Sequence, residues 1–418
     1  MARLAKTSSG ALLDRVLARP DLVALVQALE PPVLRRLVEH VGLEDAGEVV
    51  ALATTEQLER VLDEDLWRAA SAGADEELDP ERFGLWLEVL LEAGEEVAIA
   101  KLRAMDEDLL ALGLSRNVTV IDVDAMAQRM SSGSRDDDDD LVEKALESAL
   151  SIELEEFRVM ARVHAHFDAI AGVLAALDRD DHALLRRLLE RCAAATEARA
   201  EDEGLYEVLT EAESLAEDVA GARADRREAE GYVAPADARA FLALARQTAP
   251  DALLAETKPD PITRAHLRAL RPAPPRPAPS PRVEAFLREL AQGGVLPKRA
   301  RPLLLEANAA ARHTAFDRAM AELRAHDPVA FGARLAELAY LVNVLVAGAA
   351  FDGRAFRPAE AAELAALLCA VGLARDPKAD LAKDGAAVRL FRVGWRVAAR
   401  DAWDRAGIDD LRAELVRR

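Results

Sequence analysis

The stretch LAYLVNVLVAGAAF, residues 338–351, is the longest apolar run of the chain and decides how its last third folds. Its 14 residues would make about 21 Å of helix, whereas a bilayer core needs about 30 Å and about 20 apolar residues. We therefore expect no membrane insertion. A helix that is apolar on all sides is surrounded by protein, so the run predicts the central helix of a C-terminal helical bundle.

Two features of this run carry specific expectations. Gly348 and its small neighbours Ala347 and Ala349 would let another helix approach closely. A buried amide without a partner costs about 1–3 kcal/mol. Asn343 must therefore find a hydrogen-bond partner.

The composition extends the helical prediction to the whole chain. Of 418 residues, 51% are hydrophobic but only 4% aromatic, so the cores must consist of Leu, Val and Ala. Ala and Leu favour helices, whereas strands favour β-branched and aromatic residues. The length allows two or three domains. We expect a mainly α protein.

Charge is unevenly distributed along the chain, whose formal net charge is −21. Residues 1–130 carry 13 Lys and Arg against 26 Asp and Glu, residues 131–270 carry 17 against 31, and residues 271–418 carry 24 against 18. The acidic part would repel nucleic acid and anionic lipid. Nucleic acid is therefore not an expected partner.

Two cysteines, Cys192 and Cys369, stand far apart in the sequence, and neither belongs to a CxxC pair. They indicate no disulfide framework and no metal or redox site. The first residues have no apolar h-region, so they do not read as a secretory signal. We expect a cytoplasmic protein.

Residues 11–115 read as short amphipathic helices joined by tight acidic turns, with Asp21, Thr54 and Asp79 at N-cap positions. This pattern predicts an N-terminal domain of α-solenoid-like helical hairpins. Two acidic groups in it, residues 63–65 and 106–108, could be catalytic or magnesium-binding carboxylates. Each is expected to begin a helix, where negative charge complements the helix dipole.

The middle region, residues 116–270, adds a small β-hairpin to further helices. NVTVIDVD, residues 117–124, alternates apolar and polar side chains, and so does SIELEEFRVMARV, residues 151–163. A bulge near Glu155 and Glu156 would absorb one slip of phase. The two stretches are expected to pair as one antiparallel ladder.

A proline-rich linker is predicted at residues 271–283, where PAPPRPAPSP places six prolines in ten positions, 272–281. Such a segment favours extended polyproline II. It separates the middle region from the C-terminal helical bundle, residues 284–418. Pro274 to Pro277 also fits a PxxP ligand, although a linker is the expected role.

Several stretches resemble an uncharacterised bacterial family known only as a domain of unknown function. They are residues 51–67 (ALATTEQLERVLDEDLW), 78–96 (LDPERFGLWLEVLLEAGEE), 204–210, 226–246, 337–348, 356–373 and 389–398 (RLFRVGWRVA). The resemblance spans most of the chain and implies no activity, ligand or catalytic residue. The N-terminal helical hairpins also resemble the cytosolic helical domain of certain magnesium transporters, without the nucleotide-sensing and membrane segments of those proteins.

Chemical motifs are scarce. The chain contains no GxxxxGK[ST], GxSxG or HExxH motif, and we expect no cofactor. His164, His166 and Asp168 are weak metal candidates, because alternate side chains of a strand share a face; His182 or Cys192 could approach them. We expect His164 and His166 to be half-exposed side chains that bind no metal. Five consecutive aspartates, residues 136–140, are expected to form a solvated loop rather than a calcium site.

A candidate interaction surface lies near the C-terminus. Arg392, Arg396 and Arg400 recur at helical spacing beside Trp395 and Trp403. Arginines beside aromatic side chains could grip phosphate or RNA. The surrounding negative charge favours instead an acidic protein surface or the N-terminal part of the same chain.

The function expected is that of a non-enzymatic helical adaptor that binds a protein partner or itself. This hypothesis places an exposed apolar groove on the N-terminal helices. The alternative is an enzyme, or a ligand or metal sensor, with a pocket between domains.

Overall fold

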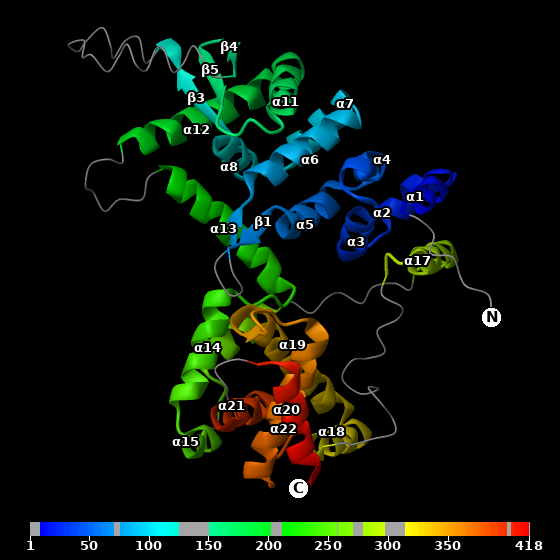
Figure 1. The fold of residues 1–418 in the computed structure, drawn as a ribbon, viewed down its shortest axis with the longest axis vertical. Helices are drawn as coiled ribbons and strands as arrows, with labels where there is room; N and C mark the ends of the chain where they lie inside the picture. The colour runs from blue at the N-terminus through cyan, green and yellow to red at the C-terminus, as the bar shows by residue number, and fades with distance from the viewer. Residues whose placement is uncertain are drawn as a thin grey trace. The chain divides into compact units, whose positions relative to one another are not determined.

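The computed structural model describes residues 9–70, 76–124, 150–201, 211–256, 258–270, 279–296, 314–398 and 403–417 (Figure 1). Within these residues helices predominate and the β-sheets are small, which confirms the mainly α fold class. The aspartate run at 136–140, most of the proline-rich linker and Arg400 lie outside the described residues.

The chain divides into two compact units. The N-terminal unit comprises residues 1–68, 77–222 and 277–299, and the C-terminal unit comprises residues 69–76, 223–276 and 300–418. The middle region expected from the sequence is therefore shared between them. Its first helices pack on the preceding helical hairpins, and its last helices pack on the C-terminal bundle.

The N-terminal unit consists mostly of short helices. Its elements are α1 (Ser9–Leu17), α2 (Leu22–Gln27), α3 (Pro31–Val41), the 3₁₀ helix η1 (Glu44–Ala46), α4 (Gly47–Leu52), α5 (Thr55–Asp65), α6 (Pro80–Glu92), α7 (Glu95–Ala104), α8 (Glu107–Asn117), α11 (Phe167–Asp180), α12 (His182–Glu201) and α17 (Pro281–Gly293). The helix α13 (Glu211–Ala229) and the paired strands β1 (Trp67–Ala69) and β2 (Glu76–Leu78) span the boundary between the units.

Helix starts in this unit follow the predicted N-caps, with one exception. Thr54 Oγ1 accepts from the Gln57 amide at 3.2 Å, and the Gln57 side chain accepts from the Thr54 amide at 2.8 Å, which completes a capping box. Asp79 caps α6 by accepting from the amide of Arg82. Asp21 stands at the start of α2 but makes no capping hydrogen bond.

The acidic group at residues 63–65 lies at the end of α5, so the expectation that it begins a helix was wrong. Asp65 is buried, and its carboxylate accepts from Arg82 Nε at 2.6 Å and from Trp86 Nε1 at 2.7 Å. These bonds link α5 to α6 and give the Asp65 carboxylate a structural role. At residues 106–108 the prediction is confirmed, because Asp106 caps α8.

The predicted β-hairpin is a three-stranded sheet. Strand β3 (Val118–Asp122) pairs with β5 (Phe157–Ala161) as expected, and β4 (Ser151–Leu154) pairs with the other edge of β5, giving the order β3-β5-β4. The slip of phase at Glu155 and Glu156 is thus a tight turn rather than a bulge. Glu155 adopts φ 51°, which lets the chain reverse within two residues.

The C-terminal unit surrounds the helix that contains the apolar run. Its elements are α14 (Pro235–Gln247), α15 (Pro250–Ala255), α16 (Pro261–Ala269), α18 (Ala315–His326), α19 (Pro328–Gly348), β6 (Ala350–Phe351), β7 (Arg354–Ala355), α20 (Pro358–Arg375), α21 (Ala386–Ala398) and α22 (Arg405–Arg417). Helix α19 packs against α14, α18, α20 and α21 (Figure 1), as predicted for a central bundle helix.

Both specific expectations for the apolar run are confirmed. Asn343 Nδ2 donates to the carbonyl oxygen of Gly231 at 2.6 Å. A Cβ on Gly348 would lie 2.7 Å from the Cβ of Ala238, so α14 approaches α19 at a point where only glycine fits. The run itself ends differently, because Ala350 and Phe351 leave the helix and form β6.

The length predicted for this helix was too short, since α19 begins ten residues earlier, at Pro328, and has 21 residues. Among the described helices, α19 is long and apolar enough to cross a membrane by length and composition alone. Core helices of soluble proteins meet the same criterion. Half of its most apolar window is buried within the protein, and so are its charged residues Arg334 and Glu337.

Helices α20 and α21 pack backbone to backbone through two glycines. A Cβ on Gly372 would lie 2.1 Å from the carbonyl oxygen of Leu390, and a Cβ on Gly394 would lie 1.9 Å from the carbonyl oxygen of Leu368. No side chain fits at either point, so the close crossing depends on both glycines.

Candidate interaction groove on the C-terminal unit

The arginines and tryptophans predicted to form an interaction surface do not share one. Arg392 is 2% exposed; its Nη1 pairs with Glu256 and lies 4.0 Å from Asp260 Oδ2. Trp395 and Trp403 are buried, with ring centroids 6.4 Å apart. Helix α21 packs against α14, α15, α19 and α20, which leaves it little free surface. Arg396 is exposed.

The histidines considered for a metal site follow the sheet instead of lying in it, because β5 ends at Ala161. His166, with φ 61°, precedes α11, and its Nδ1 pairs with Glu88 of α6. His164 and Asp168 are exposed. His182 pairs with Glu155 and Asp178, and Cys192 is buried against the carbonyl of Ala111. Within the described ranges, no group of three or more His, Cys, Asp or Glu could hold a metal ion.

A buried polar cluster in the C-terminal unit was not anticipated from the sequence. Asp260 caps α16 by accepting from the Thr263 amide at 3.0 Å, and its other oxygen accepts from Thr263 Oγ1 at 2.6 Å. The Tyr340 hydroxyl lies 3.5 Å from Thr263 Oγ1, and the His266 ring lies 4.6 Å from the Tyr340 ring. Burial raises the pKa of Tyr340 and lowers that of His266, so both are neutral near pH 7.

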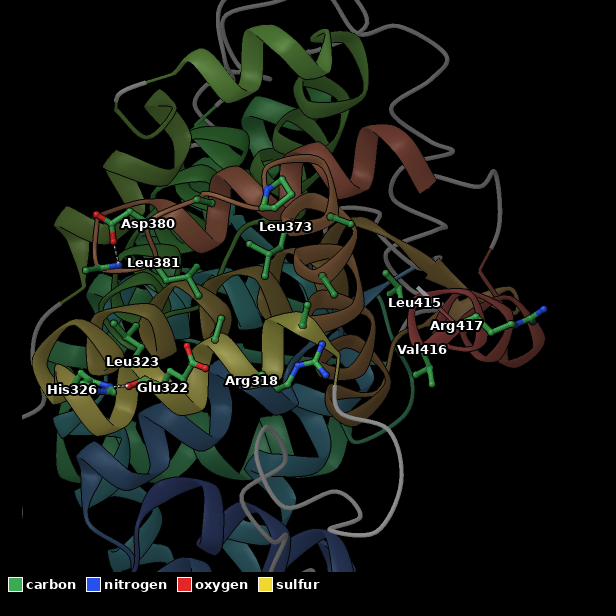
Figure 2. A pocket seen from close by; sticks show the side chains of 17 residues that line it. Arg318, Glu322, Leu323, His326, Leu373, Asp380, Leu381, Leu415, Val416 and Arg417 are labelled. Carbon is green, nitrogen blue, oxygen red and sulfur yellow. Dashed lines mark hydrogen bonds between the residues drawn. The ribbon is translucent and has the colours of Figure 1, made fainter.

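A groove of about 990 Å³ lies on the C-terminal unit (Figure 2). One wall is α18, the second is the C-terminal end of α20 with the loop that follows it, and the third is the end of α22. Its apolar lining is dominated by small side chains and leucines: Ala315, Ala319, Leu323, Ala370, Leu373, Ala374, Pro377, Ala379, Leu381, Ala382, Leu415 and Val416. The groove therefore offers apolar contacts beside the polar groups of Arg318, Glu322, His326, Asp380 and Arg417.

The loop wall of the groove is fixed from inside the core by Arg334 of α19. Its Nη1 donates to the carbonyl oxygens of Leu381 at 3.0 Å and Lys383 at 2.5 Å, and its Nη2 donates to Asp384 at 3.1 Å. Leu381 also lines the groove. Three bonds from one buried guanidinium therefore hold this wall in place.

Glu337 continues the same support. It pairs with Arg334 at 2.6 Å and accepts from the amides of Gly385 at 2.7 Å and Ala387 at 3.0 Å, at the start of α21. Burial raises the pKa of Glu337, while Arg334 and the two amides oppose that rise. The pair anchors both the groove loop and the helix after it.

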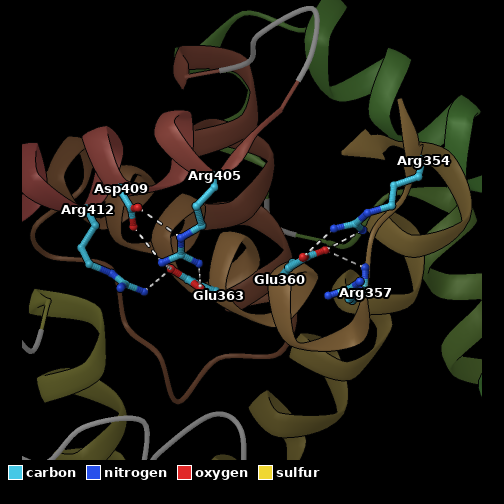
Figure 3. Close-up of polar contacts among 7 residues, drawn as sticks. All are labelled: Arg354, Arg357, Glu360, Glu363, Arg405, Asp409 and Arg412. Atoms are coloured by element: carbon cyan, nitrogen blue, oxygen red, sulfur yellow. Dashed lines mark hydrogen bonds and ion pairs between the residues drawn. The ribbon is translucent and has the colours of Figure 1, made fainter. Parts of the chain in front are cut away.

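Helix α22 is fastened to α20 by a surface ion-pair network. Figure 3 shows Arg405 between Glu363 and Asp409, at 2.8 and 2.7 Å, with Arg412 reaching the same glutamate. Beside it, Arg354 of β7 binds Glu360 at the start of α20 at 2.7 Å and, by this hydrogen bond, lowers the pKa of Glu360 to about 2. These contacts hold the third wall and the β6–β7 hairpin on α20.

The sequence did not predict the groove, because the residues that form its walls are far apart in the chain. The hypothesis of a protein-binding surface pointed to the N-terminal helices, whereas this groove lies on the C-terminal unit. Only the spacing of Ala315, Ala319 and Leu323, four residues apart, could have indicated an apolar stripe on α18.

Comparison with known proteins places the chain in a family but supplies no function. No curated protein and no solved structure matches it. The likeness to magnesium transporters found no support. A family model described as "Family of unknown function (DUF6178)" matches residues 1–354, which include α18 and α19 but end before α20. The chain belongs to the DUF6178 family of unknown function.

Proposed function

We propose that this protein is a non-enzymatic helical adaptor that binds a segment of another protein in the groove between α18, α20 and α22. The groove carries the proposal because it encloses about 990 Å³, combines alanine and leucine side chains with charged ones, and has a loop wall that is held by the protein's own core. Preorganised walls favour binding, since less conformational freedom is lost when a partner docks.

The buried charged side chains that could have served in catalysis are instead bonded to other parts of the protein, which supports a structural role for them. Asp65 is saturated by Arg82 and Trp86, and Glu337 by Arg334 and backbone amides. Arg392 is paired with Glu256. Such groups hold helices together, which leaves the groove surface as the part available to a partner.

Site-specific photocrosslinking in the native cell tests this function. A photoreactive amino acid replaces Val416 in the groove or Leu244 on α14 as the matched control; both side chains are 38% exposed and apolar. We expect a defined adduct with another protein from position 416 and none from 244. An Ala374→Glu change on the groove wall should abolish that adduct. Equal adducts from both positions, or none from 416, would overturn the proposal.

A further inference from the structure

A second concavity on the C-terminal unit differs in character from the groove. It encloses about 300 Å³ between α14, the end of α19 and the two tryptophans Trp395 and Trp403, and no described residue lines both it and the groove. Small-molecule sites span about 300–1,000 Å³, so this pocket has the size of a site for a small molecule.

The charged side chains among the described residues of the pocket lining are both basic. Arg239 and Arg246 stand seven residues apart on α14, about two turns, so both lie on one face of the helix and both are exposed. The end of α19, at Gly348, adds about half a negative charge. Two guanidinium groups exceed this charge, so the pocket favours an anion such as a carboxylate or a phosphate.

The two tryptophans form an aromatic wall that the fold holds in place. The Trp395 ring stacks on Phe391 with 6.1 Å between the ring centroids, and its centroid lies 6.4 Å from that of Trp403. The amide of Asp352, in the turn between β6 and β7, donates to the carbonyl oxygen of Trp403 at 2.8 Å. Rings fixed in this way suit a ligand with a flat apolar body.

One polar atom of the aromatic wall lacks a partner. Trp395 is 7% exposed, and its Nε1 has no hydrogen-bond partner in the described part of the chain. Buried donors are almost always bonded, because a lone one has lost its hydrogen bond to water without replacement. An acceptor oxygen supplied by a ligand would remove this penalty.

We propose that this pocket binds a small aromatic anion, either a carboxylate or a phosphate ester. Arg239 and Arg246 bind its anionic group, and one of its oxygens accepts from Trp395 Nε1. Its ring lies against the tryptophans and Leu242, which also lines the pocket. This site lies apart from the groove and goes beyond the adaptor function.

Matched probes test the site on the full chain by ligand-observed NMR titration. Benzoate and phenyl phosphate are the aromatic anions, benzyl alcohol is the neutral analogue, and inorganic phosphate is a competitor without a ring. We expect one of the aromatic anions to bind at least about fivefold more tightly than benzyl alcohol, since an exposed ion pair contributes a factor of up to about 5. Inorganic phosphate should compete only weakly. The tighter of the two anions identifies the carboxylate or the phosphate.

Four variants locate the binding. Arg239→Gln and Arg246→Gln should each weaken the aromatic anion up to about fivefold and leave benzyl alcohol unchanged. Arg264→Gln, at an exposed position of α16 outside the pocket lining, should change neither. Trp395→Phe keeps a ring but removes the donor, and it should weaken the anion about tenfold, because hydrogen bonds to charged acceptors are the stronger ones. Circular dichroism and thermal melting check that each variant folds.

The results divide cleanly. Aromatic anions that bind no more tightly than benzyl alcohol would overturn the proposal. So would equal losses in Arg239→Gln and Arg264→Gln, which would show nonspecific attraction to surface charge. An affinity that is unchanged in folded Trp395→Phe would overturn the hydrogen bond from Nε1.

Discussion

Arg334 and Glu337 stand one turn apart on α19 as a buried ion pair, with 2.6 Å between Nη2 and Oε1 and less than 5% of either side chain exposed. The arginine reaches the loop that walls the groove, and the glutamate reaches the first amides of α21. The buried Arg334–Glu337 pair therefore holds one wall of the groove, and this pair is the first target for mutation.

Replacing Glu337 with Gln should lower the free energy of unfolding by about 3–5 kcal/mol, because Arg334 would keep its charge in the core without its partner. Urea denaturation followed by circular dichroism measures the loss. Glu322→Gln, at an exposed position of α18, serves as the control and should change stability by less than about 0.5 kcal/mol. A similar small effect at Glu337 would show that the pair is not structural.

Gly394→Ala should destabilise the protein by about 3 kcal/mol or more, because the new Cβ would overlap the carbonyl oxygen of Leu368, a backbone atom that cannot move alone. Gly332→Ala is the matched control on α19, since no atom lies within 4 Å of its Cβ position. That change should stabilise by up to about 1 kcal/mol, the helix propensity difference. Thermal melts compare the two variants; equal effects would contradict the close crossing.

His266 should make stability fall as the pH drops below about 6.5. Burial lowers the pKa of His266, and the nearby Asp237 partly opposes this shift, so the unfolded chain binds the proton more readily than the folded protein. The stability is present above pH 6.5 and decreases below it by up to about 1.4 kcal/mol per pH unit. His266→Phe keeps a ring against Tyr340 and should flatten this slope between pH 7.5 and 5.5 in urea titrations. An unchanged slope would exclude His266 as its origin.

Glu360 should contribute stability that is lost in acid. Its pKa of about 2, lowered by the hydrogen bond from Arg354, lies below the ordinary 4.5, so its contribution is complete above pH 4.5 and disappears as the pH falls toward 2. Because the pair is near the surface, we expect no more than about 1 kcal/mol. Comparing wild type with Glu360→Gln at pH 6 and pH 2 should show a difference at pH 6 that is nearly gone at pH 2. A difference of the same size at pH 2 would indicate a role in packing instead.

Features whose causes are local could be predicted from the sequence. The burial of α19 follows from its apolar composition, the partner of Asn343 from the cost of an unpaired amide, and the close approach at Gly348 from its missing side chain. Thr54 and Asp79 begin helices because their side chains replace missing backbone acceptors. The fold class follows from many such local preferences acting together.

Features that depend on which surfaces meet could not be predicted in this way. Arg392 reads as an exposed base on a helix, yet its partner Glu256 stands 136 residues earlier in the chain. Residues 151–163 alternate as one strand would, but a turn at Glu155 makes two strands from them. The groove arises where α18 meets the ends of α20 and α22, and no local pattern specifies that meeting.

The contact between α20 and α21 has an approximate local two-fold symmetry. Leu368 precedes Gly372 by four residues, Leu390 precedes Gly394 by four, and each glycine faces the leucine of the other helix. Sliding one helix along the other would press a carbonyl against a neighbouring side chain at both points at once. The hairpin can therefore neither shift its register nor absorb a single bulkier residue, so distant relatives that keep this crossing must retain both glycines together.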